Sequence, residues 1–165
     1  PRRTPLLPCS KVARVDLGPV TPQQAPAKLT PAPPLAPEAI AAAGRLSGMR
    51  RDVGVLAVTS ADRLNAGWTA AQRARARGNH AAQSHIETLL GQLPRDCKLV
   101  TVIDGHPATL SWLGAVVGHQ TVPLGVEHFG QTGTISDLYK HFQIDADAIV
   151  NAANYLSAGR RIHLR

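Results

Sequence analysis

The sequence is poor in cysteine, in aromatic residues and in long apolar runs. Its 165 residues include two cysteines, and aromatic residues make up 4% of the chain. Cys9 and Cys97 are too few for a disulfide framework or a zinc site, which favours a reducing compartment. No apolar run approaches the roughly 18 residues that a membrane span needs, and the start, PRRTPLLPCS, lacks the apolar stretch of a secretory signal. We therefore expect a cytoplasmic protein with no membrane partner.

Several functional motifs are missing as well. The seven histidines show no H-E-x-x-H or Cys/His ligand spacing, so no metal site is expected. Neither G-x-G-x-x-G nor G-K-[ST] occurs, so both nucleotide fingerprints fail. Cys97 precedes an apolar run and is expected to be a small, partly buried residue. Ser84 and His85 are adjacent on a predicted helix and point about 100° apart, which does not suit a nucleophile and its base. No catalytic residue is expected in this chain.

The positive charge and the proline content are concentrated at the N-terminus. The formal net charge is +7, and ten of the thirteen prolines fall in the first 37 residues. Proline fixes φ and lacks an amide donor, so we expect residues 1–36 to be a basic, largely disordered or extended segment, with KVARV at 11–15 as a weak strand candidate. The length then favours one folded domain over 37–158, followed by a basic tail at 159–165.

Apolar runs alternate with helical patterns across that domain. Short, nearly continuous apolar runs predict strands covered on both faces. Helices separate them, with Ser60, Thr134 and Asp145 as candidate N-caps, Gly67 as a candidate interruption and Gly78 as a stop. Helices are predicted at 37–46, 61–77, 81–90, 107–117, 135–142 and 146–156, and strands at 53–58, 98–103 and 121–126. This order predicts a three-layer α/β/α fold with a mixed, mostly parallel sheet.

Polar residues gather in the two loops that follow the second and third predicted strands. In open α/β sheets ligands and partners meet at the carboxyl ends of the strands. The glycine-rich loop 127–133 could hold a phosphate, or its glycines could serve a tight loop that needs positive φ. Asp104 and His106 could form an acid–base pair near neutral pH, or they could cap the helix that Pro107 opens.

The basic run at Arg73, Arg75 and Arg77 tests whether nucleic acid is a partner. A spacing of two scatters these side chains around a helix, and no aromatic residue lies among them for base stacking. Cations near the negative end of a helix are the simpler interpretation. Specific nucleic-acid binding is not expected, although the basic N-terminus could bind polyanions weakly.

Taken together, three motifs resemble the C-terminal domain of the transketolase-like thiamine diphosphate enzymes. The resemblance covers about residues 38–157 and is greatest to the homodimeric type of pyruvate dehydrogenase E1. The motifs are the VTS turn at 58–60, the loop Leu124-Gly125-x-x-x-Phe129-Gly130, and the ending LYKHFQIDADAIV at 138–150. The resemblance implies a three-layer α/β/α domain with a five-stranded mixed sheet.

The functional implications of this resemblance are partly negative. In such enzymes other domains hold thiamine diphosphate and magnesium, through a G-D-G motif with a downstream asparagine and a separate glutamate. This chain has no G-D-G, so it is expected to bind no cofactor by itself. The C-terminal domain of the family supports a homodimer and the wall of the active-site entrance. By resemblance, the candidate interdomain or entrance residues are Asp104, Gly105, His106, His128, Phe129, Gly130 and Gln131.

The N-terminal part of the sequence departs from the family pattern. APAKLTPAPPLA stands where the family has an apolar strand, so the first strands of the sheet are expected to be missing. One hypothesis is a fragment of an E1-like or transketolase-like enzyme, whose partners would be the missing thiamine-binding domains or an E1-type chain. The other is a free-standing basic α/β module for nucleic acid or a phosphorylated ligand.

Overall fold

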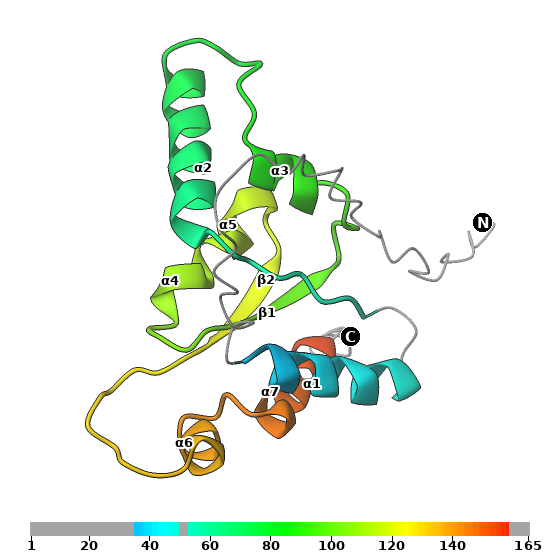
Figure 1. Cartoon of the computed structure of the whole chain (residues 1–165). Helices are drawn as coiled ribbons and strands as arrows, with labels where there is room; N and C mark the ends of the chain where they lie inside the picture. The colour runs from blue at the N-terminus through cyan, green and yellow to red at the C-terminus, as the bar shows by residue number, and fades with distance from the viewer. Residues whose placement is uncertain (1–34, 50–52, 159–165) are drawn as a thin grey trace, which may run out of the picture.

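The computed structural model describes residues 35–49 and 53–158 (Figure 1). The expectations for residues 1–34 and 159–165, including the weak strand at 11–15, lie outside the described residues. Along the described chain the elements are α1 (Ala36–Met49), α2 (Ala61–Ala76), α3 (His85–Leu90), β1 (Lys98–Val102), α4 (Ala108–Ser111), α5 (Leu113–Val117), β2 (Gln120–Leu124), α6 (Ile135–His141) and α7 (Ala146–Ala158). None of these helices is long and apolar enough to cross a membrane.

The two described strands pair in parallel, from Lys98 opposite Gln120 to Val102 opposite Leu124. The short helices α4 and α5 form the crossover between them. A parallel pair needs such a crossover, because the chain must return to the end of the sheet at which it began. The described residues therefore combine helices with a two-stranded parallel sheet, which is compatible with the predicted α/β class.

Helices α1 and α7 lie together on one side of the sheet (Figure 1). Ala42 of α1 is fully buried against α7, and this cluster includes Val100 and Val102 of β1. Leu99 of the same strand and Ile103, which directly follows it, belong to a different cluster on the opposite side. Since both sides of the strand are covered, β1 reads as a continuous apolar run rather than an alternating one.

The core on the opposite side is built mainly by the short helices. Its buried residues are Ile86, Leu90, Leu110 and Leu113. Helix α2 joins this core through Leu64 and Trp68, and the Trp68 ring stacks on Trp112 with centroids 5.4 Å apart. Two of the chain's few aromatic side chains are thus used to attach α2 to the α4–α5 crossover.

The prediction of a strand at 53–58 is wrong for the described structure. Val53–Val58 runs from the α1 side of the molecule to the start of α2 without strand pairing (Figure 1). Val55 and Leu56 are 55% and 47% exposed, so neither is covered as a buried strand would be. The apolar run gives β propensity, but a strand also needs a neighbour to receive its backbone hydrogen bonds.

Several helix boundaries also differ from the prediction. Leu35 is buried and α1 begins at Ala36, so packing extends slightly into the proline-rich segment. The helix predicted at 81–90 begins only after Ser84, which caps α3. The helix predicted at 107–117 is divided into α4 and α5 at Trp112, whose carbonyl accepts a tight i+3 hydrogen bond from Ala115. Gly67 does not interrupt α2.

The predicted caps of the last two helices are confirmed, whereas Ser60 stands at the N-cap position of α2 without a side-chain cap hydrogen bond. The Thr134 hydroxyl accepts from the Asp137 amide at 3.2 Å, and the Asp145 carboxylate accepts from the Ala148 amide at 3.1 Å. A second carboxylate acts from a distant element, since Glu38 of α1 accepts from the buried Ala146 amide at 2.8 Å. This bond fixes the start of α7 against α1.

We expect Glu38→Ala to lower the free energy of unfolding by about 1–2 kcal/mol, because it leaves the Ala146 amide at the first turn of α7 without its acceptor. Urea denaturation at neutral pH measures this loss. Asp147→Asn is the matched control: it removes an ion pair with Arg45 whose side chains are both largely exposed, and it should cost well under about 1 kcal/mol. Equal losses in the two variants would contradict the assigned role of Glu38.

Candidate functional site

The two loops identified from the sequence meet at the carboxyl ends of β1 and β2. The Val126 amide donates to the Gly105 carbonyl at 2.7 Å, which joins them directly. Gly125 permits this approach: a Cβ there would overlap the Gly105 carbonyl oxygen and lie 2.9 Å from the Pro107 nitrogen. The parallel pairing places both strand ends at one edge, so residues about twenty positions apart in the sequence form one surface.

Asp104 and His106 are exposed on the first of these loops. The Nδ1 atom of His106 accepts a hydrogen bond from the Ala108 amide at 3.2 Å, at the start of α4. No hydrogen bond joins the Asp104 carboxylate to His106, although both residues are described. The geometry therefore favours the capping interpretation of His106 over the acid–base pair.

The second loop is the most exposed part of this edge. After the buried Val126, every residue from Glu127 to Gly133 is exposed, and the loop extends away from the sheet before α6 (Figure 1). Phe129 is 89% exposed, the highest value among the large apolar residues of the described chain. Gly130 has a φ of +112°, which favours glycine and supports the tight-loop interpretation at that position.

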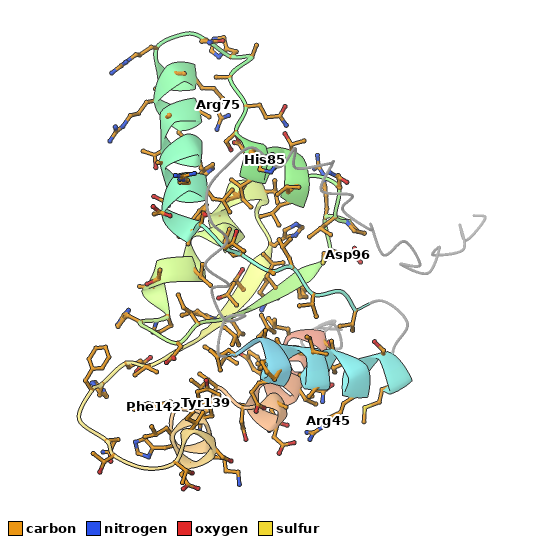
Figure 2. The ribbon with its side chains drawn as sticks, viewed as in Figure 1. Arg45, Arg75, His85, Asp96, Tyr139 and Phe142 are labelled. Carbon is orange, nitrogen blue, oxygen red and sulfur yellow. The ribbon has the colours of Figure 1, made fainter. Side chains whose placement is uncertain are left out.

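The base of this loop is fixed by a small core. Val126 packs with Leu35, Tyr139 and Ile144, and Phe142 lies beside Tyr139 on the same side of the molecule (Figure 2). Burial raises the pKa of the Tyr139 phenol, and the negative charges of Asp104 and Glu38 raise it further. Since Val126 and Tyr139 share this small core, the base of the second loop packs against α6.

We expect Gly125→Ala to destabilise the protein by about 1–3 kcal/mol and to separate the two loops, because the added Cβ collides with backbone atoms that cannot move alone. The measurement is thermal unfolding, together with amide hydrogen exchange at Val126. Gly133→Ala is the matched control, since a Cβ there meets side-chain atoms only at 3.7 Å or beyond. An unchanged exchange rate at Val126 in Gly125→Ala would contradict the close approach.

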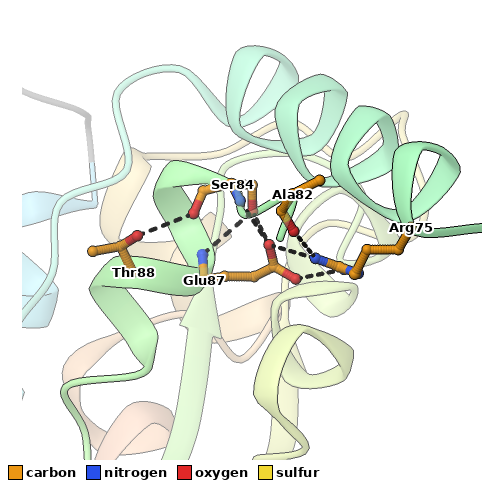
Figure 3. A network of polar contacts seen from close by, with 5 residues as sticks. All are labelled: Arg75, Ala82, Ser84, Glu87 and Thr88. Carbon is orange, nitrogen blue, oxygen red and sulfur yellow. Dashed lines mark hydrogen bonds and ion pairs between the residues drawn. The ribbon is translucent and has the colours of Figure 1, made fainter. Parts of the chain in front are cut away.

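A second polar cluster links α2 to α3 (Figure 3). The Arg75 guanidinium donates to both carboxylate oxygens of Glu87, at 2.7 and 3.3 Å, and to the Ala82 carbonyl at 2.7 Å. Glu87 also accepts from the Ser84 amide at 2.7 Å and from the Ser84 hydroxyl at 2.8 Å. Ser84 completes a capping box by accepting from the Glu87 amide.

These contacts give the cluster a structural role. The pKa of Glu87 is lowered from 4.5 to about 2, mainly because the Arg75 side chain donates hydrogen bonds to its carboxylate. Burial opposes this shift, and the hydrogen bonds from Ser84 add to it. The Ser84 hydroxyl is engaged with Glu87, and the neighbouring His85 is exposed. The sequence contained the signal for this cluster, because S-x-x-E at 84–87 is the pattern of a capping box.

A shallow pocket of about 400 Å³ lies beside this cluster, and sequence reasoning did not find it. Its walls come from the end of α2, the segment before α3, and α5. The lining residues are Arg75, His80, Ala81, Ala82, Gln83, Glu87, Gly91, Val116 and Val117. The pocket joins the Arg75–Glu87 ion pair to an apolar wall. The positive φ of Gly78, +95°, turns the chain from α2 toward it.

We expect Glu87→Gln to lower the free energy of unfolding by about 1–2 kcal/mol at pH 7, because the two charged oxygens that accept from Arg75 and Ser84 are replaced by one neutral amide oxygen. The folded-state pKa lies below the unfolded value, so the carboxylate stabilises the fold above about pH 4.5 and loses that effect as the pH falls toward 2. The difference between wild type and variant should therefore shrink over this range in urea titrations. A difference in stability that stays constant down to pH 2 would contradict the lowered pKa of Glu87.

The remaining candidates of the sequence lie at the end of α2 and just before β1. Arg73 and Arg77 are exposed, whereas Arg75 is half-buried in its ion pair. Cys97 is half-buried at the start of β1. Among the described residues, no group of three or more His, Cys, Asp or Glu side chains is placed to hold a metal ion. Two buried polar side chains, Thr101 and His119, have no hydrogen-bond partner, and nothing in the sequence signalled them.

Comparison of the chain with protein-family models, with curated proteins and with solved structures found no match.

Proposed function

We propose that this chain is a noncatalytic support domain, or a fragment of one, from a thiamine diphosphate-dependent enzyme of the pyruvate dehydrogenase E1 or transketolase type. The resemblance in sequence over about residues 38–157 suggests the family. The parallel α/β arrangement is compatible with it. In this proposal the sheet belongs to a three-layer α/β/α domain whose remaining strands come from sequence that is not part of this chain.

The observation that carries the proposal is the joined surface of the two loops at the strand ends. Phe129 is 89% exposed on a loop whose base is fixed by the hydrogen bond between Val126 and Gly105. An exposed aromatic side chain on a fixed base, surrounded by polar residues, is typical of an anchor in a protein interface. His106 is used in capping, which leaves this surface better suited to contact than to proton transfer.

On this proposal the chemistry belongs to the partner. Thiamine diphosphate and magnesium would be bound by the two other domains of the enzyme, either on an E1-type chain or upstream in a longer protein. The residues at 104–106 and 128–131 would contact those domains near the active-site entrance. The chain would increase the stability of the assembly and shape access to it, without contributing a group to the reaction.

A small binding module is the second candidate, and the pocket beside Arg75 favours it. The pocket lies close to the basic end of α2, where exposed Arg73 and Arg77 add positive charge. Such a site would suit a phosphorylated ligand. Against it, Glu87 already neutralises Arg75, which is the charged group best placed to recognise a phosphate.

The test is binding to a truncated pyruvate dehydrogenase E1 that carries only its two thiamine-binding domains. We expect measurable association in biolayer interferometry, and a loss of at least about tenfold in affinity for Phe129→Ser, because the aromatic anchor is removed. Tyr155→Ser is the matched control: Tyr155 is 70% exposed on α7 and belongs to neither loop.

Two results would contradict the proposal. The first is binding of thiamine diphosphate by this chain alone in calorimetry. The second is tight DNA binding with a steep dependence on salt, which would favour the basic module. If Phe129→Ser leaves the affinity for the E1 domains unchanged, the strand-end loops are not the contact surface. This result would leave the proposed family untouched.

A further inference from the structure

The edge of the sheet that carries Phe129 is acidic, although the chain as a whole is basic. None of the 18 lysine and arginine residues of the chain lies between residues 99 and 139. The carboxylates in this stretch are those of Asp104, Glu127 and Asp137, and all three are exposed. They belong to the first loop, the second loop and the first turn of α6, so they share the strand-end surface with Phe129.

These carboxylates lie next to the small core at the base of the second loop. Glu127 directly follows Val126 of that core, and the Val126 amide is bonded to the loop that carries Asp104. Asp137 lies on α6, which packs on the same core. The exposed Lys140 near the end of α6 offsets one of the three negative charges. The edge therefore keeps an excess of negative charge.

The described chain begins at this same core. Leu35 is 5% exposed and packs with Val126 and Tyr139. Residues 1–34, which lie outside the described residues, are therefore attached beside the acidic edge. They contain five basic side chains and a single carboxylate. A positively charged segment that is tethered next to a negatively charged edge meets it at a high effective concentration.

We propose that residues 26–34, PAKLTPAPP, pack against Phe129 and the two strand-end loops, with Lys28 facing the carboxylates. This stretch has one positive charge and no negative one, and four of its nine residues are proline. Proline-rich chains dock on aromatic side chains at a low entropic cost, because their extended form is already preset. Lys28 precedes Leu35 by seven residues, a span of up to about 23 Å, which is enough to reach the base of either loop.

The docked segment would cover the surface that the proposed function assigns to the partner. It would then act as a built-in competitor, and this consequence rests on the proposed function. A segment that is docked nine-tenths of the time lowers the apparent affinity for the partner about tenfold. The same acidic surface with its aromatic anchor would thus have two alternative occupants, one within the chain and one outside it.

NMR relaxation in the full chain tests the contact without any partner. The backbone order parameters of residues 27–29 should exceed about 0.6, below which a backbone is flexible. Phe129→Ser and Glu127→Lys should each lower them below that value, because the first removes the aromatic contact and the second reverses a charge that faces Lys28. Both altered side chains are exposed. Tyr155→Ser is the matched control, since Tyr155 is 70% exposed on α7 and should leave the order parameters unchanged.

Amide chemical shifts measure the other side of the contact. Lys28→Glu should shift the amide signals of residues 127–131. Arg73→Glu, the same charge reversal on an exposed side chain of α2, should leave these signals unchanged. Wild-type order parameters below about 0.6 at residues 27–29 would overturn the proposal. So would values that Phe129→Ser does not lower.

The competition with a partner is measured separately. In biolayer interferometry Lys28→Glu should bind the truncated E1 about tenfold more tightly than the wild-type chain does. Equal affinities of the two chains would show that the segment does not compete. Failure of both chains to bind would refute the proposed function, and the NMR measurements would still decide whether the segment docks.

Discussion

The parallel pairing of β1 with β2 is the constraint on which the rest of the structure depends. It forces the chain through the α4–α5 crossover, and it leaves both sides of the strands to be covered by helices. It also brings the two strand ends to one edge, where Val126 donates to Gly105. The core packing and the candidate surface are both consequences of this one register.

A sheet of two strands leaves backbone groups that must be protected or paired. The outer edge of β2 is protected by Pro123 and that of β1 begins with a lysine, whereas Val53–Val58 has no such protection.

The polar groups divide in a similar way between structure and surface. Glu38, Ser84 and Glu87 satisfy helix N-termini, and Arg75 holds Glu87 in its charged form. His106 caps α4. The side chains left free on the strand-end loops are those suited to contact, with Phe129 foremost. This distribution is compatible with the proposed contact surface.

The sequence by itself determined the helices that carry strong local signals, the two paired strands, and the two loops at their ends. Thr134 and Asp145 were found as caps because a cap depends on three or four adjacent residues. Only the tertiary structure decided that Val53–Val58 is not a paired strand, since an apolar run becomes a strand only where a neighbour receives its hydrogen bonds. It also decided the contacts of Glu38 with Ala146 and of Arg75 with Glu87, because side chains distant in sequence meet only once the helices have packed.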